Sequence, residues 1–288
     1  MDDMLKSFLV GSAGWQGVPH REAIAAVRAA GFGGIEILCK SGHFEPDNSV
    51  HVDEVRSALE NWPEAIVTFH APFHTVDLSS TDSATWDHAV SCVALSLRTA
   101  LTFRAESATI HTRGGGEGKN WGGDNLPAFQ RALQALVPVA AECKMTLSVE
   151  NMPPPRFATD AEDLLGLLAT YPADLVGVCF DTGHAHLAGT VVQVAGALAP
   201  RAFIMHIHDN HAVEKDEHNI PGQGTIPWPE VVSALRTNGF RGRNVMEVLK
   251  RNSEGDTIDT VRNTLDSMRN AILQTGLSDL NGRCDHNE

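Results

Sequence analysis

Short apolar segments alternate with longer amphipathic ones along the whole chain. Eight runs rich in apolar and β-branched residues predict buried strands at 8–14, 33–38, 65–72, 107–112, 145–151, 175–181, 202–209 and 243–249. Helical spacing of apolar residues recurs over 20–30, 51–60, 84–104, 126–142, 160–169, 190–199, 228–238 and 256–272. Eight strand–helix pairs predict an α/β fold, a single (β/α)8 TIM barrel. An open doubly wound sheet is the alternative, and it requires that some of these units be misassigned.

The sequence predicts one domain followed by a short tail. No Pro-, Gly- or Ser-rich linker divides its 288 residues, so the barrel is expected over 1–275. Residues 276–288 are mostly polar and predict a C-terminal tail outside the barrel.

Composition narrows the class of protein. Hydrophobic residues make up 42%, enough for a sizeable core, and no apolar run approaches the roughly 20 residues of a membrane span. The formal charge of −14 disfavours nucleic acid as a partner unless bound metal offsets it locally. Five cysteines form no CxxC pair, and the N-terminal segment lacks the basic and apolar regions of a secretion signal. We therefore expect a cytoplasmic protein with reduced thiols.

Ionisable residues recur at the carboxyl ends of the predicted strands, the end that forms the active site in barrels of this type. In chain order they are Glu36, His70, His111, Glu150, Asp181 with His184 beyond it, His206, His208 and Glu247. A lone histidine of this kind is more often a hydrogen-bonded strand-end residue, but the groups from the six strands after the one that carries Glu36 favour one shared site. Imidazoles and carboxylates are ligands of divalent metals, so we expect Mn²⁺, Co²⁺, Mg²⁺ or Zn²⁺ and no organic cofactor.

An ordered series of motifs over residues 8–250 resembles the xylose isomerase-like barrel superfamily. The motifs are FHAPF, TIHTRGG, VENMPPP, CFDTGHAH, MHIHDNH, DEHNIPGQGTIPW and VMEV. That superfamily includes sugar and sugar-phosphate isomerases and epimerases, inosose dehydratases and the endonuclease IV class of abasic-site nucleases. In the epimerase pattern, the resemblance implies a metal site made of Glu150, Asp181, His206 and Glu247. It also implies that Glu150 and Glu247 are the catalytic proton-transfer pair.

The endonuclease IV pattern uses a larger ligand set, and this sequence fills it. It implies one metal at His70, His111 and Glu150, a second at the four residues named above, and a third at His184, Asp216 and His218. Three features favour the isomerase branch. Glu36 resembles a strand-two glutamate of the sugar isomerases. The segment after His70 lacks the tyrosine-bearing loop of the nucleases, and no Arg/Lys run is present to bind phosphates.

The leading hypothesis is a metal-dependent isomerase or epimerase of a small-molecule sugar or sugar phosphate, acting by proton transfer through a metal-stabilised enediolate. An abasic-site nuclease with several zinc ions, and a polyol dehydratase or lyase, are the alternatives. His70, His111, His184, Asp216 and His218 are further metal ligands or substrate contacts. The expected substrate-binding residues are Glu36, Arg113, His208, Trp15 and Trp228. Barrels of this class often pair, so a homodimer is also expected.

Overall fold

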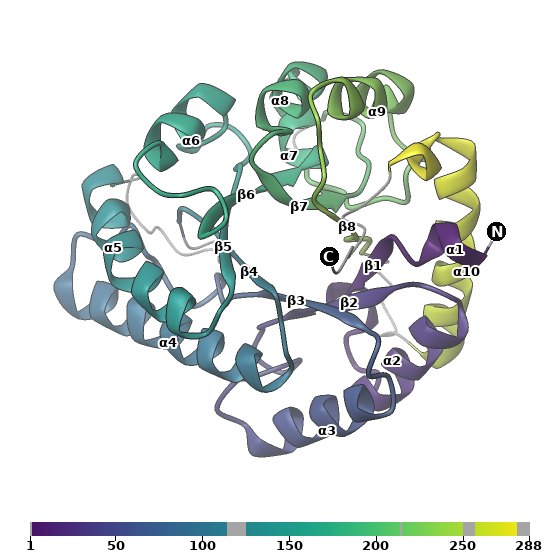
Figure 1. The fold of residues 1–288 in the computed structure, drawn as a ribbon, viewed down its shortest axis with the longest axis horizontal. Helices are drawn as coiled ribbons and strands as arrows, with labels where there is room; N and C mark the ends of the chain where they lie inside the picture. Colours follow the sequence, from purple (N-terminus) through teal and green to yellow (C-terminus); the bar gives the residue numbers. More distant parts are fainter. Residues whose placement is uncertain (1, 114–124, 214, 250–256, 281–288) are drawn as a thin grey trace, which may run out of the picture.

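Eight parallel strands close into a barrel in the computed structural model, which describes residues 2–113, 125–213, 215–249 and 257–280. The strands pair in sequence order, and the last pairs with the first (Figure 1). Their bounds are β1 Phe8–Gly11, β2 Gly34–Leu38, β3 Ile66–His70, β4 Ser107–Ile110, β5 Thr146–Glu150, β6 Val176–Asp181, β7 Ala202–Ile207 and β8 Arg243–Met246. The predicted (β/α)8 barrel is confirmed, and the open doubly wound alternative is excluded.

Helices surround the barrel, and each of the eight predicted helical segments is present. They are α2 His20–Ala29, α3 Ser49–Glu60, α4 Ser83–Thr102, α5 Leu126–Glu142, α6 Ala161–Leu168, α8 Val191–Leu198, α9 Trp228–Thr237 and α10 Ile258–Gln274. Four short helical segments were not predicted: α1 Asp2–Leu5, α7 Thr182–Leu187 and the 3-10 turns η1 Ser12–Trp15 and η2 Leu277–Asp279. Among the described residues, none of these helices combines the length and apolarity that crossing a bilayer requires.

Local chemistry explains where several helices begin and end. The side chains of Asn48, Asp82 and Asn125 accept hydrogen bonds from backbone N–H groups in the first turns of α3, α4 and α5. Gly31 and Gly239 follow α2 and α9 with φ of 89° and 78°, a conformation that glycine adopts at little cost. These signals place the helices at regular intervals between the strands.

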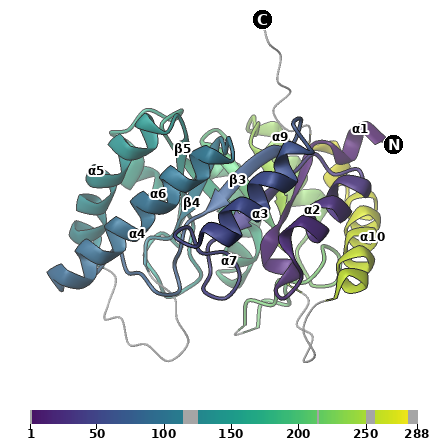
Figure 2. The same cartoon turned by 90° about the horizontal axis from the view of Figure 1, so that it is seen from below.

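The two ends of the barrel differ in chemistry. Opposite the strand carboxyl ends, Arg243 at the start of β8 donates to Glu106 just before β4 (Nη2 to Oε2, 2.9 Å). The carboxyl ends instead carry the longer loops and α7, which is labelled in the lower half of the side view in Figure 2. One end therefore carries a partly buried ion pair, whereas the other holds the ionisable residues discussed below.

Packing continues past the predicted domain boundary at residue 275. Leu277 and Leu280 are both buried in the hydrophobic core next to α10 and η2. The expected polar tail from residue 276 is thus packed as far as residue 280, because apolar side chains at helical spacing anchor it. Residues 281–288 lie outside the described part of the chain.

Candidate metal centre

Four predicted ligands meet at the centre of the barrel mouth. The ligand atoms of Glu150, Asp181, His206 and Glu247 all lie within 4.8 Å of one another. His206 Nδ1 is 3.1 Å from Glu247 Oε2, 3.4 Å from Glu150 Oε1 and 3.9 Å from Asp181 Oδ2. Since nitrogen and oxygen ligands bind zinc at about 2.0–2.2 Å, atoms at this mutual spacing can share one ion.

Buried polar atoms without hydrogen bonds support the fit to a cation. Glu150 Oε2 and His206 Nδ1 are both buried and accept no hydrogen bond within the described chain. Leaving such groups unsatisfied is costly, and native proteins rarely do so without a reason. A divalent cation coordinated by these atoms would provide that reason.

Mutual electrostatics keep the cluster in its charged forms. Burial raises the pKa of Glu150, but His111 and His206 outweigh it and hold that pKa well below the usual value. Burial lowers the pKa of His206, and its negatively charged neighbours outweigh that effect and raise it well above 6.5. Protons on the imidazoles therefore offset the negative charge of the carboxylates, and a bound cation could offset that charge in their place.

The Asp181-Thr-Gly-His184 motif positions two of these groups through helix α7. Asp181 Oδ1 accepts a hydrogen bond from the backbone N–H of His184 (2.7 Å), so this aspartate caps the helix that carries the histidine. A Cβ atom at Gly183 would lie 2.0 Å from the His208 ring, which explains the glycine in the motif. The spacing of Asp181 and His184 is therefore set by the capped turn.

Glu36 contacts Nε2 of His206, the ring nitrogen that does not face the other three predicted ligands. Its Oε1 lies 2.9 Å from His206 Nε2, and its Oε2 accepts a hydrogen bond from Thr68 Oγ1 (3.0 Å). Only 2% of Glu36 is exposed, and it does not line the cavity described below. Glu36 therefore faces the imidazole of His206 and not the cavity, and this geometry does not support the predicted substrate contact.

A second group of predicted residues adjoins the first through Glu150. Glu150 Oε2 lies 2.9 Å from His111 Nε2 and 3.4 Å from His70 Nε2. His70 Nδ1 lies 2.9 Å from the carbonyl oxygen of Ala71, so a proton there leaves Nε2 free to act as an acceptor. Burial dominates at His111 and lowers its pKa to about 4.

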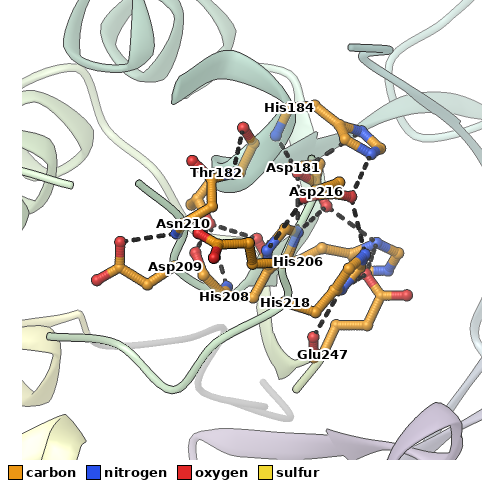
Figure 3. A network of polar contacts seen from close by, with 12 residues as sticks. Asp181, Thr182, His184, His206, His208, Asp209, Asn210, Asp216, His218 and Glu247 are labelled. Carbon is orange, nitrogen blue, oxygen red and sulfur yellow. Dashed lines mark hydrogen bonds and ion pairs between the residues drawn. The ribbon is translucent and has the colours of Figure 1, made fainter. Parts of the chain in front are cut away.

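Asp216 joins a third group at the rim of the mouth (Figure 3). Its Oδ2 lies 3.2 Å from His184 Nε2 and 2.8 Å from His218 Nε2. The Nδ1 atoms of the two rings face the carbonyl oxygens of Asn151 and Glu247, at 2.8 and 3.0 Å. Burial lowers the pKa of His218, but the Asp216 carboxylate outweighs it and raises that pKa to about 9.

His208 lies on the outer side of Asp181. Its Nε2 is 2.9 Å from Asp181 Oδ2, and its ring stacks on His218 with centroids 3.9 Å apart. The side chain is fully buried and does not line the cavity, so its position supports contact with Asp181 more than the predicted contact with substrate. It also forms a potential ligand group with His218 and Glu247.

A cavity of about 340 Å³ opens over the three groups. It is lined by His70, Phe73, His111, Glu150, Met152, Pro153, Arg156, His184, Asp216, His218 and Glu247. The sequence analysis assigned no role to Met152, Pro153 or Arg156, although the VENMPPP motif contains the first two. They lie on the loop after β5, where no periodicity marks a side chain, and only their proximity to Glu150 in the chain could have indicated them.

Three expected substrate contacts lie elsewhere. Trp15 is 1% exposed and donates from Nε1 to His20 Nδ1 (3.3 Å), and Trp228 is 3% exposed and donates from Nε1 to Asp209 Oδ2 (2.9 Å). Arg113 lines a separate crevice of about 10 Å³, too small for a sugar. Both indoles are core residues because their N–H groups have buried acceptors. Residues 114 and 115, which follow Arg113 in the TIHTRGG motif, lie outside the described part of the chain.

A family model described as a xylose isomerase-like TIM barrel matches residues 24–271. The chain belongs to the xylose isomerase-like TIM barrel family. The resemblance inferred from its motifs is therefore confirmed, and it extends over most of the chain.

Similar proteins span nearly the same length as this member of the family. An uncharacterised protein of Methanocaldococcus jannaschii is 26% identical over 228 residues, which cover 75% of this chain and 76% of that protein. A D-psicose 3-epimerase of Enterocloster bolteae is 23% identical over 275 residues, covering 88% and 85%. The crystal structure of a D-tagatose 3-epimerase-like protein has a TM-score of 0.75 at 21% identity, covering 95% and 99%. At this identity, the solved structure establishes the shared fold.

Proposed function

We propose that this protein is a divalent-metal-dependent isomerase or epimerase of a sugar or sugar phosphate. The observation that carries the proposal is the convergence of Glu150, Asp181, His206 and Glu247 within 4.8 Å beside a cavity of about 340 Å³. Its similarity to proteins described as D-psicose 3-epimerase and D-tagatose 3-epimerase-like supports the same class of reaction. The four residues would hold the ion, with Mn²⁺ and Co²⁺ as the first candidates.

The two glutamates suit proton transfer at a carbon next to a carbonyl. When bound, a divalent ion supplies Lewis acidity that stabilises negative charge on the substrate oxygens. Glu150 and Glu247 both line the cavity, and their pKa values are held low, so each is ionised and able to accept a proton. One carboxylate removes the proton. A proton is then returned to the same or the neighbouring carbon, either by that glutamate, which is now protonated, or by the other glutamate after it has taken a proton from solvent. Phe73, packed against His111 with ring centroids 4.2 Å apart, supplies an apolar wall.

Solvent deuterium exchange tests this proposal. The metal-loaded protein is incubated in D₂O with a panel of ketoses, and deuterium at the carbon next to the carbonyl is measured by NMR. We expect exchange with the wild type and no exchange with Glu150→Gln. The control is Glu217→Gln, which changes an acid outside the cavity on the loop that carries Asp216, and it should exchange deuterium as the wild type does. Absence of exchange across free and phosphorylated ketoses, with protein that is folded and metal-bound, would overturn the proposal.

A multi-zinc phosphodiesterase of the abasic-nuclease type is a second candidate. The observation that favours it is that Glu150 and Glu247 connect the central group to two further groups of potential ligands. The net charge of −14 counts against a nucleic-acid substrate. About three zinc ions per chain together with cleavage of abasic duplex DNA would reverse the order of the two candidates.

The dehydratase alternative, the location in the cell and the oligomeric state also remain proposals. Loss of water from a cyclic polyol would use the same acids and bases, and it would appear in the exchange experiment as a dehydrated product. Four cysteines are free in the described chain, as expected in the cytoplasm, where we propose that the protein acts. A homodimer remains a prediction for solution measurements.

A further inference from the structure

We propose that Glu150, Cys179 and His206 form an inner metal position that binds divalent cations with a preference for sulfur ligands, such as Zn²⁺ and Cd²⁺. The ligand atoms of these three residues all lie within 4.8 Å of one another. Of the free cysteines in the described chain, Cys179 alone belongs to such a group. The inner position goes beyond the proposed isomerase function, because binding of a cation there requires no sugar.

The pairing of β5 with β6 places the thiol beside Glu150. Glu150 and Cys179 are register partners on these two parallel strands, so their side chains leave the sheet on the same side. Cys179 and Asp181 are two positions apart on β6 and share a face, and Asp181 pairs with His206 on β7. The thiol therefore lies inside the barrel, one step further from the mouth than the Asp181 carboxylate.

Burial and the lack of hydrogen bonds point to a cation at this place. Cys179 and His206 are fully buried, and only 1% of Glu150 is exposed. Glu150 Oε2 and His206 Nδ1 have no hydrogen-bond partner in the described chain, and such buried polar atoms are uncommon in proteins. Zinc binds sulfur at about 2.3 Å and imidazole nitrogen at about 2.0–2.1 Å, so atoms at this mutual spacing can share one ion.

The ligand chemistry distinguishes the inner position from the central group of Glu150, Asp181, His206 and Glu247. Three carboxylates and one imidazole suit Mn²⁺, whereas a thiolate favours Zn²⁺ and the still softer Cd²⁺. Burial raises the pKa of the Cys179 thiol well above its usual value, so the sulfur keeps its proton until a coordinated cation displaces that proton to solvent. The inner position therefore discriminates against ions that bind sulfur weakly.

The inner position and the central group share Glu150 and His206, so we expect their ions to compete. Cys179 and His206 do not line the cavity, and a cation bound to them is therefore held away from a substrate. Cd²⁺ added to the Mn²⁺-loaded protein should release Mn²⁺, which is measured by the electron paramagnetic resonance signal of the free ion. Cys179→Ser should need at least about 10-fold more Cd²⁺ for the same release, the lower end of the loss for residues that support a metal ligand.

Titration of the metal-free full-length protein with Cd²⁺ tests the inner position without turnover. A cadmium–thiolate bond gives a charge-transfer absorption in the ultraviolet, and we expect the first equivalent of Cd²⁺ to produce it in the wild type. Cys179→Ser, a change of nearly the same shape, should lose this absorption and leave the dissociation constant for Mn²⁺ unchanged. The control is Cys92→Ser, which changes a partly exposed thiol 3.5 Å from His88 Nε2 and should retain the absorption.

Two results would overturn the proposal. One is an absorption that persists in Cys179→Ser or disappears in Cys92→Ser, since the thiolate would then lie elsewhere. The other is an equal loss of affinity for Mn²⁺ and Cd²⁺ in Cys179→Ser, which indicates a structural role for the thiol. Failure of the deuterium-exchange experiment would overturn the isomerase function alone, because no step of the cadmium titration involves a substrate.

Discussion

Glu36 Oε1 lies 2.9 Å from His206 Nε2, on the opposite edge of the ring from Nδ1, which faces Glu150 and Glu247. A carboxylate at Nε2 favours the tautomer with its proton on that nitrogen, and this leaves the Nδ1 lone pair for an ion. Thr68 in turn holds the other oxygen of Glu36. The ligand is thus oriented by a buried residue that cannot reach the cavity.

The first prediction concerns the contact between Glu36 and His206. Glu36→Gln should raise the dissociation constant for Mn²⁺ by about 10- to 100-fold, because the amide orients His206 less strongly and makes it less basic. Titration calorimetry measures the constant, and circular dichroism checks the fold. Glu60→Gln, at the exposed end of α3, is the control. An unchanged constant in Glu36→Gln would remove Glu36 from the account of the metal centre.

The second prediction is that metal binding releases protons. The pKa of His218 is raised to about 9, and those of His184 and His206 are raised well above 6.5, because carboxylates outweigh burial at each ring. We therefore expect these imidazoles to carry a proton at pH 7 without metal. His206 must lose its proton to become a ligand, and the positive charge of a bound ion favours loss of the protons on His184 and His218 as well. Metal affinity should therefore fall as the pH is lowered from 8 to 6. Calorimetry in two buffers of different ionisation enthalpy counts the protons, and equal enthalpies in both buffers would contradict the prediction.

The third prediction concerns acid stability away from the metal centre. Burial, with nearby His20 and Lys40, lowers the pKa of His43 to about 3. Between about pH 6.5 and 3 the unfolded chain binds a proton at this residue that the folded chain does not, so the free energy of unfolding decreases as the pH falls. From pH 7 to pH 5 this histidine should account for about 2 kcal/mol. Urea denaturation should show that loss reduced in His43→Gln and unchanged in the exposed variant His88→Gln.

The fourth prediction separates packing from substrate binding at Trp228. Its indole N–H donates to Asp209, which also accepts hydrogen bonds from the backbone N–H groups of Gly222 and Ile226. Trp228→Phe should lower the free energy of unfolding by about 1.5–3 kcal/mol, since it removes one hydrogen bond to a buried carboxylate. The dissociation constant for Mn²⁺ should change less than threefold. A stable variant with greatly weakened metal binding would contradict this assignment.

Much of the fold could be predicted because each strand of a barrel is buried on both faces. Val176–Asp181, for example, is buried throughout and appears in the sequence as a short apolar run that ends in a carboxylate. The same geometry explains why Glu150 and Asp181 were identifiable: they are the last residues of neighbouring strands, and parallel strands bring such ends together.

Some residues have roles that depend on how deep they lie in the barrel or on the conformation of a loop, and these roles could not be predicted from the sequence. Alternation along β7 places His206 and His208 on the same face, but the strand ends at Ile207, and Thr182 hydrogen-bonds the backbone of His208 beyond it. Trp228 is the first residue of the amphipathic helix α9, and the acceptor of its indole N–H lies 19 positions away in the chain. Arg156 belongs to a turn with no periodic pattern. For such residues the partner is set by tertiary structure.

Anomalous diffraction from crystals grown with Mn²⁺ tests directly whether the four residues at the centre of the barrel mouth hold one metal ion. Data collected on both sides of the manganese absorption edge identify the ion and its ligands in a single experiment. We expect a manganese peak between Glu150, Asp181, His206 and Glu247, with nitrogen and oxygen ligands at about 2.0–2.2 Å from the ion, as in comparable metal sites. A fully ordered barrel mouth without a peak there, or with manganese bound only at other residues, would contradict it.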